Sequence, residues 1–169
     1  MIKKLFHGSN VAIEAIDLSK SLADKDFGKG FYLTDIESQA IAMAQRRVRI
    51  MGHGEPIVSV FEFDDDCLLQ GNLNVKIFPD EVSAEWAEFV NANRNATQTG
   101  FTHSYDIVIG PVANDGVAFQ LERYNEGVID IDTLAKELAY RKLNRQYFFG
   151  SEKAIELLKN DEQRNKVFD

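Results

Sequence analysis

A short stretch near the start of the chain, residues 26–35, places two glycines directly before an apolar segment and a helical pattern. Gly28 and Gly30 flank a lysine and permit tight backbone turns and the close approach of a ligand. Phe31–Leu33 predicts a short strand leaving this loop, and Asp35 is expected to cap the helix that follows. The missing third glycine and the order of loop and strand exclude a Rossmann dinucleotide fingerprint, and the ending of a phosphate-binding P-loop is absent too. The fold must therefore accommodate a glycine loop, an aromatic strand and a helix in direct succession.

Hydrophobic periodicity outlines the other elements of the chain. Apolar runs predict strands, and apolar residues at helical spacing predict helices. Strands are expected at 2–6, 57–63, within 68–78, at 105–110 and, as the last one, at 146–149. Helices are expected at 36–51, 81–92, around 117–124, at 132–142 with Asp132 as its cap, and after a Ser151 cap to residue 158. A turn is expected at 7–10, and loops are expected over 11–23 and 91–100.

The order of these elements indicates the fold class. Strands and helices are mixed without regular alternation, which favours an α+β fold over a doubly wound α/β fold. At 169 residues the chain is long enough to bury a core of its own. Residues 1–169 are therefore expected to form a single domain.

Composition restricts the partners and the compartment. The net charge of −8 argues against a protein whose main partner is nucleic-acid phosphate. A local basic cluster, Arg46-Arg47-Val48-Arg49, is predicted to be a solvated helix face. The single cysteine, Cys67, excludes an intrachain disulfide, and its acidic neighbours disfavour a catalytic thiol. With no leader-like segment and no apolar run of membrane-spanning length, the chain is expected to be cytoplasmic.

The sequence predicts no metal site. His53 and His103 have no second ligand at the spacing that zinc requires. Asp64, Asp65 and Asp66 form one acidic run without the glycine-interrupted pattern of a calcium loop, so a solvated turn is expected there.

Three segments far apart in the chain form a joint pattern. They are His7-Gly8-Ser9, Gly28-Lys29-Gly30-Phe31-Tyr32 and Arg145-Gln146-Tyr147. In this order and spacing they resemble the ADP-ribosyltransferase superfamily, in the branch related to poly(ADP-ribose) polymerases, whose signature is a His, a Tyr and a Glu on three strands. The segments 105–112 and 146–158 are similar to a bacterial domain-of-unknown-function family within that superfamily, often encoded beside small antitoxin-like genes. The resemblance covers residues 5 to about 158.

The resemblance implies split mixed and antiparallel sheets with flanking helices, and a site for NAD. His7 would hydrogen-bond the adenine-side ribose, and Gly8 would present backbone groups to the nicotinamide carboxamide. Tyr32 would stack on the nicotinamide ring, and Gln146 would approach the nicotinamide-side ribose. An imidazole suits a ribose diol, and an aromatic face suits a flat heterocycle. The residues expected at the NAD site are His7, Gly8, Ser9, Gly30, Phe31, Tyr32, Ala40 and Met43, and the expected catalytic set is His7, Tyr32 and Gln146.

Several positions depart from the family pattern. Gln146 replaces the glutamate; its oxygen accepts a hydrogen bond but carries no full charge and is no base near neutral pH. Loss of a charged partner costs ~2–4 kcal/mol of transition-state stabilisation, which argues against polymer elongation. Ala40 stands where polymerases have a serine and Met43 where they have a tyrosine, so the nicotinamide pocket would be less polar and less aromatic. Glu152 and Asp115 are candidate compensating or acceptor-site carboxylates.

The first functional hypothesis is an NAD-dependent mono-ADP-ribosyltransferase of bacterial type. Such an enzyme cleaves the nicotinamide–ribose bond and transfers ADP-ribose to an acceptor, here as the toxin of a toxin–antitoxin pair with an antitoxin protein as partner. The acidic surface favours a protein acceptor over a nucleic acid. A catalytically weak or silent NAD-binding module is the alternative, favoured by Gln146. In a third class, a structural or partner-binding domain, Tyr32 is only a half-buried strand aromatic and His7 only a turn histidine.

Overall fold

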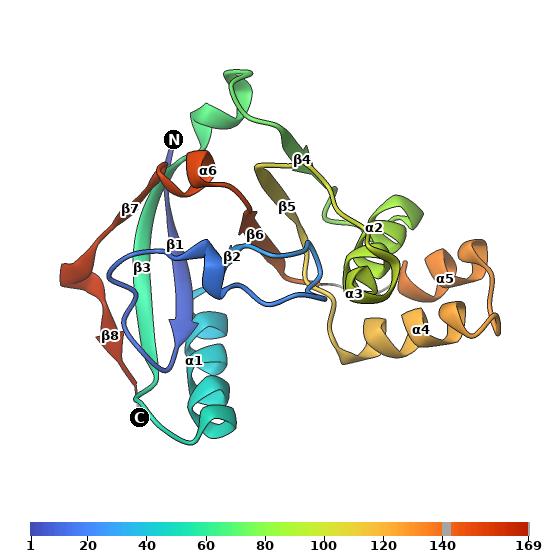
Figure 1. The fold of residues 1–169 in the computed structure, drawn as a ribbon, viewed down its shortest axis with the longest axis horizontal. Helices are drawn as coiled ribbons and strands as arrows, with labels where there is room; N and C mark the ends of the chain where they lie inside the picture. The colour runs from blue at the N-terminus through green and yellow to red at the C-terminus, as the bar shows by residue number, and fades with distance from the viewer. Residues whose placement is uncertain (140–142, 169) are drawn as a thin grey trace.

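The chain folds into two four-stranded sheets flanked by helices, which confirms the α+β class (Figure 1). The computed structural model describes residues 1–139 and 143–168. The strands are β1 (Ile2–Ser9), β2 (Phe31–Leu33), β3 (Ile57–Asp64), β4 (Val75–Ile77), β5 (Ile107–Pro111), β6 (Arg145–Phe149), β7 (Leu158–Asn160) and β8 (Lys166–Val167). The helices are α1 (Glu37–Met51), α2 (Ala84–Arg94), α3 (Ala96–Thr99), α4 (Asp115–Asn125), α5 (Ile131–Leu138) and α6 (Glu152–Ile155). Short 3₁₀ turns lie at Leu18–Lys20, Asp65–Leu69 and Glu162–Arg164.

The two sheets differ in strand direction. The first is antiparallel, in the order β1-β3-β7, and β8 also pairs with β3. The second has the order β2-β6-β5-β4 and is mixed, because β4 runs parallel to β5 while the other pairs are antiparallel. Among the described residues, the split into one antiparallel and one mixed sheet is the arrangement expected from the sequence.

Alternation along β6 divides the buried residues into two clusters. Phe149 belongs to a cluster shared by the two sheets, together with Leu5, Phe61 and Ile107. Phe148 points to the opposite face and packs with residues of α2, α4 and α5. Since successive side chains of a strand face opposite sides, one apolar strand serves both clusters. The second sheet is therefore covered by the first sheet on one face and by helices on the other.

Helix α1 covers the first sheet and ends as its sequence predicts. Gly52 adopts a left-handed conformation at its C-cap with φ of 73°, and its N–H donates to the carbonyl of Val48. Its beginning differs from the prediction, because Asp35 is not the cap. The N-cap position is Ile36, whose N–H donates to Oγ1 of Thr34 at 3.1 Å, and the Asp35 carboxylate instead accepts from the hydroxyl of Tyr147.

Other boundaries also correct the sequence-based prediction. The turn expected at 7–10 is largely strand, because the pairing of β1 with β3 continues to Ser9 opposite Ile57. The loop expected over 91–100 contains the end of α2 and all of α3. The expected final helix is one short turn, and Leu158 lies in β7, so β6 is not the last strand.

Helix α5 also differs from its prediction. Its cap is Asp130, whose carboxylate accepts from the N–H of Thr133, rather than Asp132. The part predicted over 140–142 lies outside the described residues. The remaining predicted helices and strands are present, and the Ser151 cap is confirmed. Asn114 caps α4.

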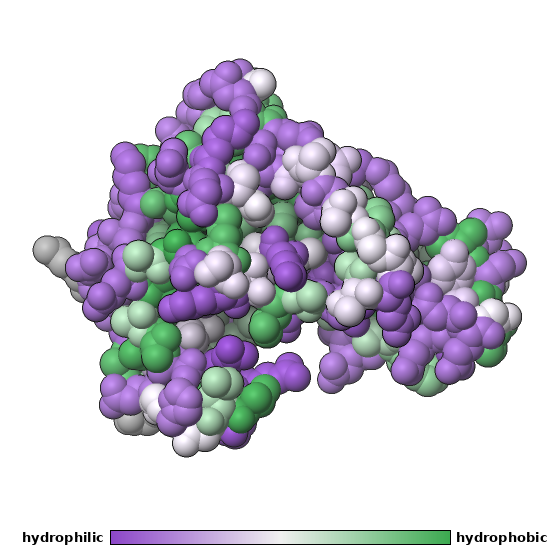
Figure 2. Space-filling view, in the orientation of Figure 1, coloured by the Kyte–Doolittle hydropathy of each residue, from purple (hydrophilic) through white to green (hydrophobic). Residues whose placement is uncertain are grey.

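The surface of the molecule is hollowed between two of its parts. Figure 2 shows a notch between the region of α1 and the region of α4 and α5, in the orientation of Figure 1. Within the described ranges, no helix combines the length and apolar character needed to cross a bilayer.

Candidate functional site

Within residues 1–139 and 143–168, the two sheets are joined at one isolated backbone bridge, between Phe6 and Thr34. The N–H of Phe6 lies 2.7 Å from the carbonyl oxygen of Thr34, and the N–H of Thr34 lies 3.0 Å from that of Phe6. Beyond this bridge β1 pairs only with β3, while β2 pairs with β6. The backbone pairing of β1 with β2 is therefore interrupted one step past the bridge, and this interruption, with Gly8 on one strand and Tyr32 on the other, is called the gap.

Gly8 presents its backbone to this gap. In an antiparallel ladder the peptide groups of alternate residues point to opposite sides of the strand. The peptide groups of Phe6 hydrogen-bond Thr34 and therefore point away from β3. Gly8 lies two residues further along β1, so its peptide groups point away from β3 as well. A Cβ on Gly8 would lie 1.9 Å from the carbonyl oxygen of Ala40 and 2.8 Å from the nitrogen of Ala44. Glycine is thus required for the contact between β1 and α1. No described residue hydrogen-bonds the Gly8 peptide groups that point toward the gap.

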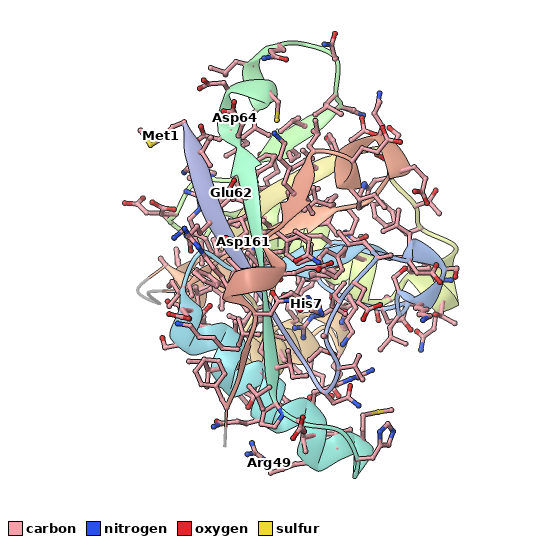
Figure 3. The ribbon with its side chains drawn as sticks, turned by 90° about the vertical axis from the view of Figure 1, so that its left-hand side faces the viewer. Met1, His7, Arg49, Glu62, Asp64 and Asp161 are labelled. Carbon is pink, nitrogen blue, oxygen red and sulfur yellow. The ribbon has the colours of Figure 1, made fainter. Side chains whose placement is uncertain are left out.

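His7 lies on the other face of β1 and reaches across to β2. Figure 3 shows Met1 and Asp64 together at one end of β1 and β3, and His7 toward the other end. The His7 ring stacks on Phe31, with centroids 4.4 Å apart, and its Nδ1 lies 2.8 Å from the carbonyl oxygen of Tyr32. A carbonyl only accepts, so Nδ1 carries the hydrogen and donates.

The protonation state of His7 follows from its surroundings. Burial lowers the pKa of His7 below its usual 6.5; the hydrogen bond to Tyr32 opposes this shift, and the charge of Arg47 adds to it. The ring is therefore neutral near pH 7, and Nε2 is left with a lone pair. Among the described residues no hydrogen-bond donor to Nε2 is present. His7 consequently offers one acceptor, the type of group that a ribose hydroxyl needs.

Tyr32 points from β2 into the helix-covered face of its sheet. Its ring meets Phe148 edge-on, with centroids 5.2 Å apart, and lies 6.5 Å from the ring of Phe27. The hydroxyl donates to the carbonyl of Gly28 at 2.6 Å and accepts from the N–H of Phe27 at 3.0 Å. Burial raises the pKa of Tyr32 far above its usual value of 10, so the phenol stays neutral. The hydroxyl therefore holds the glycine loop in place, and the ring is half-buried between the loop and Phe148.

Local structure explains why positions 28 and 30 of the loop are glycines. Gly28 has a φ of 93°, which L side chains rarely adopt. A Cβ on Gly30 would lie 2.2 Å from a ring carbon of Phe148 and 2.8 Å from the carbonyl oxygen of Phe149. His103 fixes the loop further, since its Nε2 donates to the carbonyl of Phe27 at 2.6 Å while its Nδ1 accepts from a backbone N–H. The loop is thus held by the Tyr32 hydroxyl and by His103.

Gln146 shares a face of the second sheet with Tyr32, because Tyr32 pairs with Phe148 and Gln146 lies two residues away on β6. Its side chain is buried, and its Nε2 donates to a carboxylate oxygen of Asp26 at 2.9 Å. Asp26 also accepts from Arg94 at 2.8 Å and from the N–H of Ala113 at 3.0 Å. Asp26 and Arg94 were not predicted from the sequence. The only signal for them was an acidic residue at the start of the glycine stretch.

The other predicted site residues take varied positions. Ser9 ends β1 and makes one long hydrogen bond of 3.4 Å with Asn10. Ala40 is fully buried against Gly8, whereas Met43, on the same helix, is 58 % exposed. Ala40 therefore packs against β1 at Gly8, and Met43 lies on the surface.

The two candidate carboxylates do not join Gln146. Glu152 is exposed in the first turn of α6, past the end of β6 opposite to Gln146. Asp115 is exposed at the first residue of α4 and lines a shallow cavity of ≈ 380 Å³ together with Arg94. The carboxylate nearest to Gln146 is instead that of Asp26.

The structure joins the predicted set only in pairs. His7 contacts the backbone of Tyr32, and Tyr32 and Gln146 lie on one sheet face. The rings of His7 and Tyr32 have different neighbours, Phe31 for the first and Phe148 for the second. Tyr32 is the member that the two pairs share.

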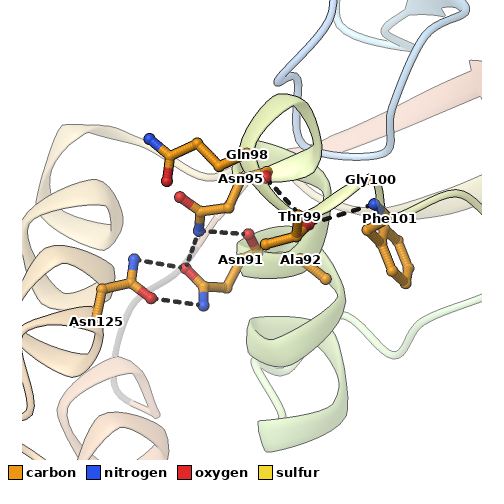
Figure 4. Close-up of a pocket in the computed structure, with 8 residues that line it drawn as sticks. All are labelled: Asn91, Ala92, Asn95, Gln98, Thr99, Gly100, Phe101 and Asn125. Atoms are coloured by element: carbon orange, nitrogen blue, oxygen red, sulfur yellow. Dashed lines mark hydrogen bonds between the residues drawn. The ribbon is translucent and has the colours of Figure 1, made fainter.

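A depression of ≈ 650 Å³ lies elsewhere, among α2, α3 and α4 (Figure 4). Carboxamides dominate it, and Asn91 and Asn125 donate to each other at 2.9 Å in both directions. Because these polar groups satisfy one another, this depression gives no sign of a missing ligand. The gap between β1 and β2 differs, because Nε2 of His7 and the peptide groups of Gly8 that point toward β2 have no hydrogen-bond partner among the residues that the structure describes.

The acidic cluster at Asp64–Asp66 and the thiol of Cys67 have ordinary explanations. Asp64, Asp65 and Asp66, the only metal-type cluster among the described residues, contact the amino group of Met1 at 3.1, 3.0 and 2.8 Å. Cys67 is a free thiol whose pKa is raised by burial and by the neighbouring Asp64 charge. Neither group has the surroundings of a reactive site.

The architecture defines an α+β protein whose two sheets separate beside a glycine loop. The chain belongs to the DUF3990 family, described as proteins of unknown function, whose model matches residues 3–160. No curated protein and no solved structure matches the chain.

Proposed function

We propose that the protein is an NAD-dependent mono-ADP-ribosyltransferase. The observation that carries the proposal is the gap beyond the Phe6–Thr34 bridge, where the peptide groups of Gly8 point toward β2 and the half-buried ring of Tyr32 leaves β2 on the helix-covered face. These are the groups that the resemblance assigns to the carboxamide and the ring of nicotinamide. A peptide N–H and C=O together suit a primary amide, because they supply one donor and one acceptor.

The chemistry follows from the groups around the gap. The bond between nicotinamide and C1′ of the ribose breaks, nicotinamide leaves with the bonding electrons, and a nucleophilic acceptor bonds to C1′ and releases its proton. The transition state resembles an oxocarbenium ion, as in glycoside hydrolysis. Since NAD supplies the leaving group, the protein mainly has to bind and orient it. His7 would accept from one ribose through Nε2, and Gln146 would accept from a hydroxyl of the other through Oε1.

A second candidate function is a catalytically weak or silent NAD-binding module. The observation in its favour is Gln146, which is neutral and whose amide nitrogen is bound to Asp26. Gln146 supplies neither charge nor a base to the ribose. The resemblance adds an antitoxin protein as a proposed partner of either form, and the acidic surface favours a protein acceptor.

Label transfer distinguishes the two candidates. The protein is incubated with adenylate-labelled NAD and a bacterial lysate, alongside His7→Ala and Tyr32→Ala. The enzyme labels an acceptor, and both variants lose the label. Thermal unfolding with millimolar NAD is measured in parallel, because a ligand that binds the native state raises its stability by about 1.4 kcal/mol at ten times its Kd. Stabilisation without label transfer or nicotinamide release selects the silent module, and no stabilisation at all contradicts both.

A further inference from the structure

Asp26 is the most heavily bonded side chain of the glycine loop. One carboxylate oxygen, Oδ1, lies 2.8 Å from both Nε and Nη2 of Arg94. The other, Oδ2, accepts from the N–H of Ala113 at 3.0 Å and from Nε2 of Gln146 at 2.9 Å. The side chain is only 12 % exposed. All four contacting groups are hydrogen-bond donors, two to each carboxylate oxygen.

This arrangement determines which way the Gln146 carboxamide is turned. A carboxylate accepts and does not donate, so Nε2 must face Asp26. The carbonyl oxygen of Pro111, another acceptor, lies 3.5 Å from the same Nε2. Reversing the amide would place Oε1 against two acceptors. Oε1 is therefore directed away from them, and no described residue donates to it.

We infer that Asp26 is a positioning residue that holds Oε1 of Gln146 toward the ribose of NAD. The inference rests on the proposed function for its substrate, but the orientation of the amide is a property of the protein alone. It gives the glutamine a role that a glutamate could not take, because a carboxylate at position 146 would lie beside that of Asp26. Replacing Gln146 by the glutamate of the ADP-ribosyltransferase pattern is thus expected to lower activity.

Three variants test the positioning role in nicotinamide release. In Asp26→Asn only one side-chain oxygen remains for the donors Arg94, Ala113 and Gln146, so Gln146 can turn its amide over. The kcat is expected to fall at least tenfold, with the KM for NAD changed less than threefold. Gln146→Glu is expected to lose activity as well. The double variant D26N/Q146E can pair an amide with a carboxylate again, and it is expected to exceed Q146E at least tenfold.

Asp24→Asn is the matched control. Asp24 lies in the same loop and binds the N–H and Oγ1 of Thr97 at 2.9 and 2.8 Å, without contact to Gln146. Its kcat should equal that of the wild type. Equal losses in D26N and D24N, or a Q146E variant more active than the wild type, would overturn the inference.

A second measurement needs no activity and survives poor folding of D26N. Thermal midpoints of Gln146→Glu and Gln146→Met are compared from pH 7 to pH 4. With Asp26 beside position 146, Q146E should melt at least about 3 °C below Q146M at pH 7, and the difference should shrink toward pH 4 as one carboxyl is protonated. Equal midpoints at pH 7 would refute the positioning role. A wild type that releases no nicotinamide while the melting pattern holds would refute the proposed function alone.

Discussion

The hydroxyl of Tyr32 can be separated from its ring by the substitution Tyr32→Phe. The hydroxyl makes two hydrogen bonds to the glycine loop, at 2.6 Å to the carbonyl of Gly28 and at 3.0 Å from the N–H of Phe27. Each such bond contributes about 0.5–1.5 kcal/mol net. The pair therefore predicts a loss of about 2 kcal/mol in the free energy of unfolding. For a domain of this size that loss lowers the melting temperature by about 4–8 °C.

Tyr147→Phe is the matched control, on the strand next to β2. Its hydroxyl makes a single, longer bond of 3.3 Å to Asp35, which is exposed to water. The loss expected there is below about 1 kcal/mol. Denaturant unfolding followed by circular dichroism measures both variants. Equal stability of the wild type and Tyr32→Phe, or a larger loss in Tyr147→Phe, would refute the assignment of the hydroxyl to the loop. Since Tyr32→Phe keeps the ring, it is also expected to keep nicotinamide release where Tyr32→Ala loses it.

Three further predictions concern packing, pH and capping. Gly8→Ala places a Cβ 1.9 Å from the carbonyl oxygen of Ala40, and denaturant unfolding should show a loss of about 3 kcal/mol or more. The pKa of His7 is lower in the folded protein than in the unfolded chain. The stability that neutral His7 contributes is therefore present above about pH 6.5 and is lost as the pH falls below that value. His7→Gln should consequently lose less stability than the wild type between pH 7 and pH 5. Asp130→Ala removes the cap of α5 and should lower the free energy of unfolding by about 1 kcal/mol, whereas Asp132→Ala should leave it nearly unchanged.

Each of these predictions has a control and a contrary outcome. Ser9→Ala, one residue along β1, should be close to neutral; if Gly8→Ala matched it, α1 could not approach β1 as closely as described. The same change at exposed His53 controls the pH series, and parallel stability curves for His7→Gln and the wild type would speak against the burial of His7. Similar losses in the two aspartate variants would return the cap of α5 to Asp132.

Local patterns predicted much of the fold. The apolar run of β3, the helical spacing of α1 and the stop at Gly52 are all written in neighbouring residues, and they are present. The end of β1 was mispredicted because Gly8 and Ser9 have turn composition, while pairing with β3 keeps them extended. The cap of α1 was mispredicted because Thr34 and Asp35 are both capable of the role, and the bridge to Phe6 decides where the chain enters the helix.

The candidate site was only partly predictable for a similar reason. His7, Tyr32 and Gln146 were found through short motifs, each of which is local. The contacts of Asp26 join it to residues 68, 87 and 120 positions away, and no local pattern encodes such distances. The hydrogen bonds by which the Tyr32 hydroxyl holds the loop could not be predicted either. Both partners are backbone groups, which every residue type except proline supplies in full, so no sequence pattern marks them.

Release of nicotinamide from NAD by the purified protein tests the central claim most directly. The product is quantified by chromatography over time and over a range of NAD concentrations, for the wild type and for Tyr32→Ala. The account predicts slow release that saturates with NAD and disappears in the variant. No release during long incubation, or release at the same rate from both proteins, would contradict it.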